Sequence, residues 1–224
     1  MRLSATIRHS LFVLLSVASL QACRPAEDQT AVAPQTNTAD SYSNEVALQW
    51  SAMHFRLVRN SPGQSPPVAS RTFGYAGLAL YEAVVPGLPG SRSMAGQFQG
   101  LTSLPIIQSG QPYNWALSAN AAEAEMLRGL FANTTDVYKK RIDSLETALY
   151  NQFKSTDLAT SERSAVYGKS VANALFEWSK TDGGHEGYNR NFPASFVPVT
   201  DAGTWRPTEN GRLIPMQPYW GKNR

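Results

Sequence analysis

Residues 65–84 read SPPVASRTFGYAGLALYEAV, and this stretch predicts a long, closely packed helix. Ser65 followed by Pro66 is typical of an N-cap and a first helical residue, because proline lacks the N–H that the first turn leaves unbonded. The prolines and glycines of residues 86–90 predict that the helix ends near Val84. Small residues on the inner face would let another helix approach closely, and that face is formed by Thr72, Tyr75, Ala76, Ala79, Leu80 and Ala83.

Before this stretch, apolar residues at helical spacing predict a first helix. Ser43 is its expected N-cap, with Glu45 in the first turn, and residues 60–63 (Asn-Ser-Pro-Gly) end it. The residues expected on its inner face are Val46, Trp50, Met53 and Leu57.

Three more helices are expected after a long loop that reaches about Tyr113. The third helix begins near Trp115, the fourth follows a break at residues 133–136, and the fifth runs over about residues 161–180. The inner faces are expected to carry Leu117, Ala121, Ala124, Leu127 and Phe131 in the third, Tyr138, Ile142, Leu145, Leu149 and Phe153 in the fourth, and Ala165, Gly168, Ala172 and Leu175 in the fifth.

The predicted fold class is all-α: an antiparallel helical bundle with long irregular loops, since no stretch has the pattern of a strand. Asp182-Gly183-Gly184 is expected to end the last helix. The remaining tail is rich in Gly, Pro and Asn and carries aromatic residues that are typically buried, so we expect it to lie against a large body. These aromatic residues are Tyr188, Phe192, Trp205, Tyr219 and Trp220.

The N-terminus has the features of an export signal. Residues 1–9 form a short basic segment that contains Arg2 and Arg8. Residues 10–20 form an apolar run that is shorter than the roughly 20 residues a membrane-spanning helix needs. Residues 20–23, Leu-Gln-Ala-Cys, match a lipobox, which predicts a signal peptide over residues 1–22 and lipidation at Cys23. The alternative is an ordinary signal peptide followed by a chance cysteine.

A lipidated Cys23 would hold the protein to a membrane of the cell envelope, because each buried CH₂ of an acyl chain adds roughly 0.8 kcal/mol. Arg24, rather than aspartate, follows the cysteine, which favours the outer membrane. Residues 23–41 are polar, contain Pro25 and Pro34 and lack apolar periodicity, so we interpret them as a disordered tether. The helical region is then residues 42–224.

The charge balance argues against a nucleic-acid partner. The whole chain has 20 basic and 17 acidic residues, and the signal takes Arg2 and Arg8 and no acid, so the mature chain is nearly neutral. It has no basic stripe and no motif of the nucleic-acid-binding folds.

Few residues have the pattern of a catalytic or metal site. His54 lies one position from the first helix's apolar stripe, and we expect it to be partly buried and structural. His185 could contact a metal or substrate, or it could be a solvated loop residue. Glu82 is expected to pair with Arg71 or another buried base rather than to act as an acid. No residue set has zinc-ligand spacing.

The order of several segments resembles the N-terminal half of envelope proteins in the vanadium-dependent haloperoxidase-like, type 2 phosphatidic acid phosphatase superfamily. The resemblance covers about residues 42–224 and rests on the order rather than on one motif. The segments are Trp50 with Arg59, residues 65–71 and 75–83, Trp115 with residues 119–121, residues 164–172, Trp178 with residues 182–183, residues 205–208 and residues 218–221.

That resemblance implies an all-α fold and a pocket that holds phosphate or vanadate among cationic and hydrogen-bond-donating groups. The family's signature pieces are a Lys separated by six residues from an Arg-Pro, a Ser-Gly-His, and a later Arg with a His. Arg206-Pro207 has Val199 in place of the Lys, Gly183-Gly184-His185 lacks the Ser, and Ser109-Gly110 is followed by Gln111. No catalytic, cofactor-binding or metal residue can therefore be carried over.

The resemblance leads to two alternative functions. The chain is expected to be the scaffold portion of a haloperoxidase-like or acid phosphatase-like protein, half of a larger helical fold, whose catalytic half is missing and would be its partner. Alone it would be inactive and hold no cofactor, while the complete protein could bind vanadate. The alternative is a non-enzymatic helical binding lipoprotein, with Trp205, Tyr219 and Trp220 as ligand platforms.

Overall fold

The computed structural model describes residues 37–208 and 210–224, and in these residues the chain forms five α-helices and no strand. The predicted all-α class is confirmed. The helices are α2 (Glu45–Asn60), α3 (Pro66–Val84), α4 (Trp115–Leu130), α5 (Asp136–Phe153) and α6 (Leu158–Ser179), and short 3₁₀ turns lie at η1 (Ala39–Ser41), η2 (Val85–Gly87), η3 (Gly187–Asn189) and η4 (Trp220–Lys222).

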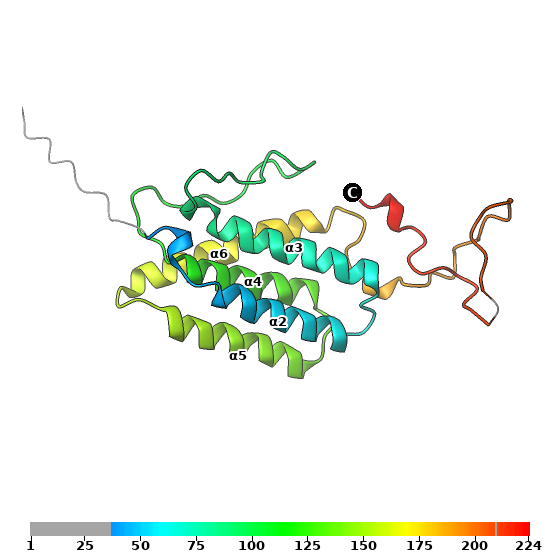
Figure 1. The fold of residues 1–224 in the computed structure, drawn as a ribbon, viewed down its shortest axis with the longest axis horizontal. Coiled ribbons are helices and arrows are strands. Elements are labelled where there is room, and N and C mark those ends of the chain that lie inside the picture. The colour runs from blue at the N-terminus through cyan, green and yellow to red at the C-terminus, as the bar shows by residue number, and fades with distance from the viewer. Residues whose placement is uncertain (1–36, 209) are drawn as a thin grey trace, which may run out of the picture. The chain divides into compact units, whose positions relative to one another are not determined.

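Helix α4 is the centre of the bundle and packs against the other four α-helices (Figure 1). Its sequence fits that place, because Ala116, Ala119, Ala122 and Ala124 are all buried and give the neighbouring helices room to approach. Successive helices run in opposite directions, so α3 and α5 are antiparallel to α2, α4 and α6 (Figure 1). A helix that is buried on all sides needs small or apolar residues on every face.

The contact between α4 and α6 depends on a glycine. A Cβ added at Gly168 would lie 2.1 Å from the carbonyl oxygen of Ser118, so the two backbones touch at this point. The neighbouring α6 residues Val171, Ala172 and Leu175 are fully buried. The predicted inner face of α6 therefore packs as expected, except that Ala165 is only partly buried.

Two hydrogen bonds tie α2, α4 and α5 together inside the core. The indole N–H of Trp50 donates to the side-chain oxygen of Asn120 at 2.9 Å. The amide of Asn120 donates in turn to the carbonyl oxygen of Glu146, also at 2.9 Å. Asn120 is buried, and the oxygen and the nitrogen of its amide group each make a hydrogen bond to a neighbouring helix.

Two predicted helix starts differ from the structure, and one predicted cap makes no capping hydrogen bond. The residue before α2 is Asn44, not Ser43. Helix α6 begins at Leu158, three residues before the predicted Ser161, because the side chain of Asp157 accepts a hydrogen bond from the N–H of Ala159 and caps the helix there. Ser65 does precede α3, with proline at the first helical position, but its side chain makes no capping hydrogen bond.

The chain after α6 differs from the expectation in its burial. Trp205 and Tyr219 remain 45% and 42% exposed, so they do not pack against a large body within the described residues. Tyr188, Phe192 and Trp220 are partly buried. The tail returns to the bundle at its end, where the backbone N–H of Arg224 donates to the carbonyl oxygen of Asp182 at 2.9 Å.

The predicted signal peptide, the lipidation site Cys23 and most of the predicted tether lie outside the described residues. Within the described part, order begins before the predicted boundary at residue 42: residues 39–41 form η1, and the carbonyl of Asn37 accepts a hydrogen bond from the indole of Trp115. None of the helices that the structure describes is both long enough and apolar enough to cross a membrane.

Candidate functional site

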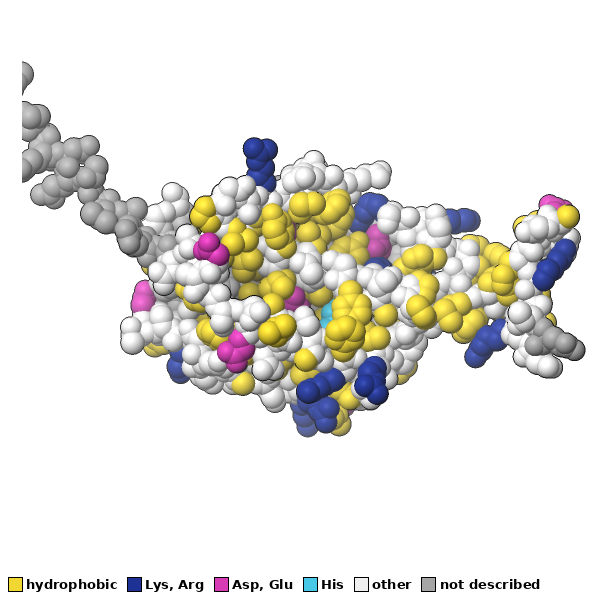
Figure 2. Space-filling model, in the orientation of Figure 1, with side chains coloured by type: hydrophobic (Ala, Val, Ile, Leu, Met, Phe, Trp, Pro, Cys, Tyr) yellow, Lys and Arg dark blue, Asp and Glu magenta, His cyan; other side chains and the backbone are white. Residues whose placement is uncertain are grey.

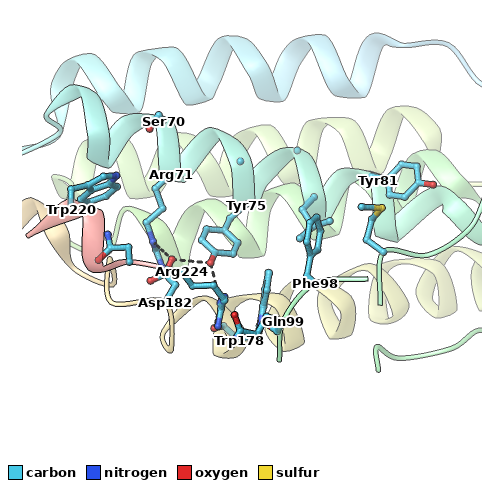
Figure 3. A pocket seen from close by; sticks show the side chains of 15 residues that line it. Ser70, Arg71, Tyr75, Tyr81, Phe98, Gln99, Trp178, Asp182, Trp220 and Arg224 are labelled. Atoms are coloured by element: carbon cyan, nitrogen blue, oxygen red, sulfur yellow. Dashed lines mark hydrogen bonds and ion pairs between the residues drawn. The ribbon is translucent and has the colours of Figure 1, made fainter. Parts of the chain in front are cut away.

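A pocket of about 730 Å³ lies beside α3 (Figure 3). We call it the Arg71 pocket. Helix α3, the loop before α4, the end of α6 and the last residues of the chain contribute to it. Its lining comprises Ser70, Arg71, Gly74, Tyr75, Gly77, Leu78, Tyr81, Met94, Phe98, Gln99, Trp178, Asp182, Trp220, Asn223 and Arg224.

A buried ion pair forms one end of the Arg71 pocket. The Nε of Arg71 donates to the Asp182 carboxylate at 2.6 Å, and one Nη donates to the other carboxylate oxygen at 3.2 Å. The same Nη donates to the carbonyl oxygen of Ser179 at 2.7 Å. The side chains of Arg71 and Asp182 are 9% and 5% exposed, so the pair fastens the start of α3 to the end of α6.

Tyr75 extends this ion pair into a hydrogen-bonded chain (Figure 3). Its hydroxyl donates to Asp182 at 2.8 Å, and an Nη of Arg224 lies 3.4 Å from the same hydroxyl. Burial of Asp182 opposes its ionisation, but the hydrogen bonds and charge of Arg71 outweigh burial and hold the pKa of this carboxyl below its usual range. Burial, followed by the neighbouring Asp182, raises the pKa of Tyr75. At neutral pH the group is thus an ionised carboxylate, a neutral phenol and two guanidinium ions.

Arg224 lies across the face of Trp178, with its guanidinium carbon 4.2 Å from the ring centroid. It also donates to the hydroxyl of Thr181 at 2.9 Å and to the carbonyl of Trp178 at 3.2 Å. No carboxylate among the described residues is within ion-pair distance of it. Its charge is therefore not neutralised by an acid of the described chain.

The expected pairing of Arg71 with Glu82 is wrong. The two residues are eleven positions apart on one helix, which separates them by roughly 16 Å along its axis at 1.5 Å per residue. Glu82 instead accepts hydrogen bonds from the Ser93 hydroxyl at 2.8 Å and from the backbone N–H of Met94 at 2.6 Å. It anchors the long loop that carries Met94 and Phe98 into the Arg71 pocket.

His54 is structural, as expected, but more deeply buried than predicted. It is 3% exposed, stacks on Phe73 with ring centroids 4.0 Å apart, and lies 2.8 Å from the hydroxyl of Thr72. Burial lowers its pKa to about 4, so the ring is neutral at physiological pH. These contacts link α2 to α3 and leave the ring away from the Arg71 pocket.

His185 lies near the ion pair without joining it. Its ring contacts Phe176 edge-on at 5.8 Å and its Nε2 is 3.9 Å from the Glu186 carboxylate. Partial burial lowers its pKa. The described residues place no group of three His, Cys, Asp or Glu side chains where they could share a metal ion.

Several residues of this site were not foreseen from the sequence. Asp182 was expected to end a helix and belonged to a segment of the resemblance, but it was not expected to pair with Arg71, and Arg224 carried no expectation. Two exposed glycines inside the α3 pattern, Gly74 and Gly77, were a usable signal, because glycine in a helix interior costs stability and needs a reason. Glu123, which is 5% exposed on α4, was also missed, and burial raises its pKa to about 8.

Residues that carried the sequence resemblance fall into two groups in space. Trp50, Asn120 and Gly168 hold the bundle together, as described above. Arg71, Tyr75, Trp178, Asp182 and Trp220 come from three separate segments and line the Arg71 pocket. Trp205 and Arg206, which also contributed to the resemblance, are exposed and lie outside it.

Comparisons with known proteins add nothing to this picture: no family model matches the chain, and neither the curated proteins nor the solved structures give a match.

Proposed function

We propose that the described helices are the N-terminal scaffold portion of a membrane-anchored protein of the haloperoxidase-like or acid phosphatase-like kind, and that this chain alone is inactive. In this proposal the bundle supplies the frame, a separate catalytic half supplies the anion pocket, and the complete protein binds vanadate or a phosphate ester.

One observation carries this proposal. Segments that resemble the family, separated by as many as 149 positions between Arg71 and Trp220, converge on the Arg71 pocket. Convergence of this kind is expected when the segments belong to one folded unit with a common role. The all-α class agrees with the family's fold, although many unrelated proteins share that class.

The coding locus gives the most direct test. We expect the reading frame to continue past codon 224 into a Lys separated by six residues from an Arg-Pro, a Ser-Gly-His and a later Arg with a His. The extended product should then oxidise bromide with added vanadate or hydrolyse p-nitrophenyl phosphate, while the 224-residue chain does neither. A stop codon directly after Arg224, or activity of the 224-residue chain itself, would contradict the proposal.

The proposed location is the outer membrane, through a lipid on Cys23. This part rests on the sequence of residues 20–23 and on Arg24. A Cys23→Ser variant should fail to incorporate radiolabelled palmitate and should leave the membrane fraction, whereas the unmodified chain should be labelled and stay in that fraction. Equal labelling of the two proteins would count against the anchor.

A second candidate function is a non-enzymatic binding lipoprotein, and the Arg71 pocket favours it because the pocket is formed by this chain alone. Its size lies in the range of about 300–1,000 Å³ that is usual for small-molecule sites. Of the three aromatic residues expected as platforms, Trp220 lines the pocket, while Trp205 and Tyr219 do not. Binding of any small molecule that Trp220 and Trp178 sense would support this function.

A further inference from the structure

Two glycines of α3 leave one wall of the Arg71 pocket bare. Gly74 and Gly77 lie in the interior of the helix, and a Cβ added at either would meet no atom within 4 Å. Close packing therefore does not require glycine here, in contrast to Gly168, where an added Cβ would collide with backbone. Larger residues would be better helix formers, so the effect of the glycines is to keep the pocket open.

The remaining walls are mainly apolar and aromatic. Leu78 and Tyr81 continue the α3 wall, Phe98 comes from the long loop, and Trp178 lies roughly parallel to Phe98, with centroids 5.9 Å apart and an interplanar angle of 23°. Trp220 closes the end beside Arg71 (Figure 3). Surfaces of this composition favour a flat or chain-like apolar group, because most of the contact area is carbon.

The charges of the lining residues do not balance. Arg71 is neutralised by Asp182, whose two oxygens already accept hydrogen bonds from Arg71, Tyr75 and the N–H of Gly184. Arg224 adds a second guanidinium over Trp178 without an acidic partner in the described chain. The side chains of the lining therefore carry one excess positive charge, located over the ring of Trp178. Guanidinium ions bind carboxylates and phosphates through paired hydrogen bonds.

We propose that the Arg71 pocket binds a small amphiphilic anion, a molecule with an apolar ring or chain body and one carboxylate or similar acidic head. The body lies on the bare glycine wall between Leu78, Phe98 and Trp178, and the acidic head pairs with Arg224. The proposal rests on the second candidate function, that the pocket is a binding site, and does not depend on a catalytic half.

The test uses two probes with the same ring system and head groups of similar size: the anion 2-naphthoate and the neutral amide 2-naphthamide. The full chain in non-ionic detergent is titrated with each by calorimetry, after subtraction of the same titration into detergent. We expect one 2-naphthoate per chain, bound at least tenfold more tightly than 2-naphthamide. Raising the salt concentration should weaken the binding of the anion and leave that of the amide nearly unchanged.

Variants locate the site and the charge. Gly77→Leu places a side chain in the pocket from a position where an added Cβ meets no atom within 4 Å, so it should lower 2-naphthoate affinity at least tenfold while the melting temperature stays equal or rises. Ala148→Leu, an exposed position on α5 outside the pocket, is the matched control and should bind normally. Arg224→Gln should weaken 2-naphthoate about tenfold and leave 2-naphthamide unchanged.

The outcomes separate this proposal from the function on which it rests. Equal affinity for the two probes, with both lost in Gly77→Leu, would overturn anion recognition and keep a binding pocket. Absence of binding by either probe at millimolar concentration would overturn both. Normal 2-naphthoate binding in Gly77→Leu would place the site elsewhere and also overturn the proposal.

Discussion

Glu123 and His54 are buried in the core, and their pKa values move in opposite directions. Glu123 lies on α4, which is surrounded by other helices, and burial raises its pKa from 4.5 to about 8. His54 lies between α2 and α3, and burial lowers its pKa from 6.5 to about 4. Burial disfavours the charged form in both cases, which makes an acid weaker and a base weaker.

The two groups affect stability with opposite signs. Between about pH 4.5 and 8, the folded chain keeps the Glu123 proton that the unfolded chain releases, so stability falls as the pH rises. Between about pH 4 and 6.5, the unfolded chain binds a proton at His54 that the folded chain does not, so stability rises with pH. The two slopes oppose each other up to about pH 6.5, and above it Glu123 acts without this opposition.

We therefore predict that Glu123→Gln flattens the decline in stability above pH 6.5. Each pH unit between 6.5 and 8 should cost the unmodified chain about 1 kcal/mol that the variant does not lose. Urea unfolding followed by circular dichroism at pH 6.5, 7.25 and 8 measures the difference. Parallel curves for the two proteins would show that Glu123 is already ionised in the folded chain. Below pH 6.5 the variant should show the His54 slope more clearly than the unmodified chain.

For single residues, the sequence predicted which helix face a residue lies on better than how deeply that residue is buried. His54 sits next to an apolar stripe, so its burial followed from helical spacing. Glu123 lies on a helix whose neighbours cover every face, and the five-helix arrangement that buries it cannot be derived from the periodicity of α4 alone. The expected pair of Arg71 and Glu82 is wrong, although the two side chains have opposite charges. They lie eleven positions apart on one helix, and only residues three or four positions apart are neighbours on a helix surface.

At the scale of elements, two helical glycines should respond to alanine in opposite ways. At Gly168 the added methyl would lie 2.1 Å from the Ser118 carbonyl oxygen, so α4 and α6 must separate. We expect Gly168→Ala to destabilise the chain by about 1–3 kcal/mol, the usual range for overpacking. At Gly77 nothing lies within 4 Å, and Gly77→Ala should stabilise by up to about 1 kcal/mol through helix propensity.

Thermal or urea unfolding of the two glycine variants checks this pair of predictions in one experiment. Each variant controls for the other, because the chemical change is identical and both positions are helical. Equal effects at the two sites would contradict the close approach of α4 and α6 that the structure shows.

The start of α4 depends on Asn114. Its side chain accepts a hydrogen bond from the N–H of Leu117 at 3.2 Å and donates to the Phe153 carbonyl at 2.8 Å. We predict that Asn114→Ala destabilises by about 2 kcal/mol, since it removes the cap and the hydrogen bond to a partly buried carbonyl. Asn114→Ser keeps a capping oxygen but cannot reach Phe153, so its loss should be about half as large. If both variants lose the same stability in urea unfolding, the hydrogen bond to Phe153 accounts for the whole effect and the cap contributes nothing.

Helix boundaries illustrate what the sequence can and cannot supply at this scale. The ends of α3 followed directly from Ser65-Pro66 and from the Pro-Gly turn after Val84. Helix α6 starts three residues before the predicted Ser161, because Asp157 caps it, and an acidic residue directly before Leu158 fits the pattern of an N-cap.

At the scale of the whole chain, the Arg71 pocket could not be predicted, because it depends on contacts between residues more than a hundred positions apart. Arg71 pairs with Asp182, and Arg224 returns to Tyr75 and Trp178 after the long tail. Helical periodicity constrains neighbours three or four positions apart and gives no information about such pairs. The sequence did indicate the residues involved, since Arg71, Tyr75 and Trp178 all belong to segments that stood out.

The tail and the long loop should differ in their resistance to proteolysis. Arg212 and Leu213 are exposed, with Leu213 at 77%, and the tail residues around them bond mainly to close neighbours. Arg92 is exposed too, but its carbonyl accepts a bond from Tyr81 and the adjacent Ser93 donates to Glu82. Cleavage requires local opening, which costs more where such anchors must break.

We predict that trypsin cuts the folded chain after Arg212 at least several-fold faster than after Arg92. The Arg206-Pro207 bond should resist trypsin because proline follows the arginine. Timed digestion with mass spectrometry of the products measures both rates. Arg212→Gln should remove the first product and leave the Arg92 rate unchanged. Glu82→Gln, which weakens the anchor of the long loop, should raise the Arg92 rate selectively. Faster cleavage at Arg92 in the unmodified chain would mean that Glu82 does not hold this loop against the bundle in solution.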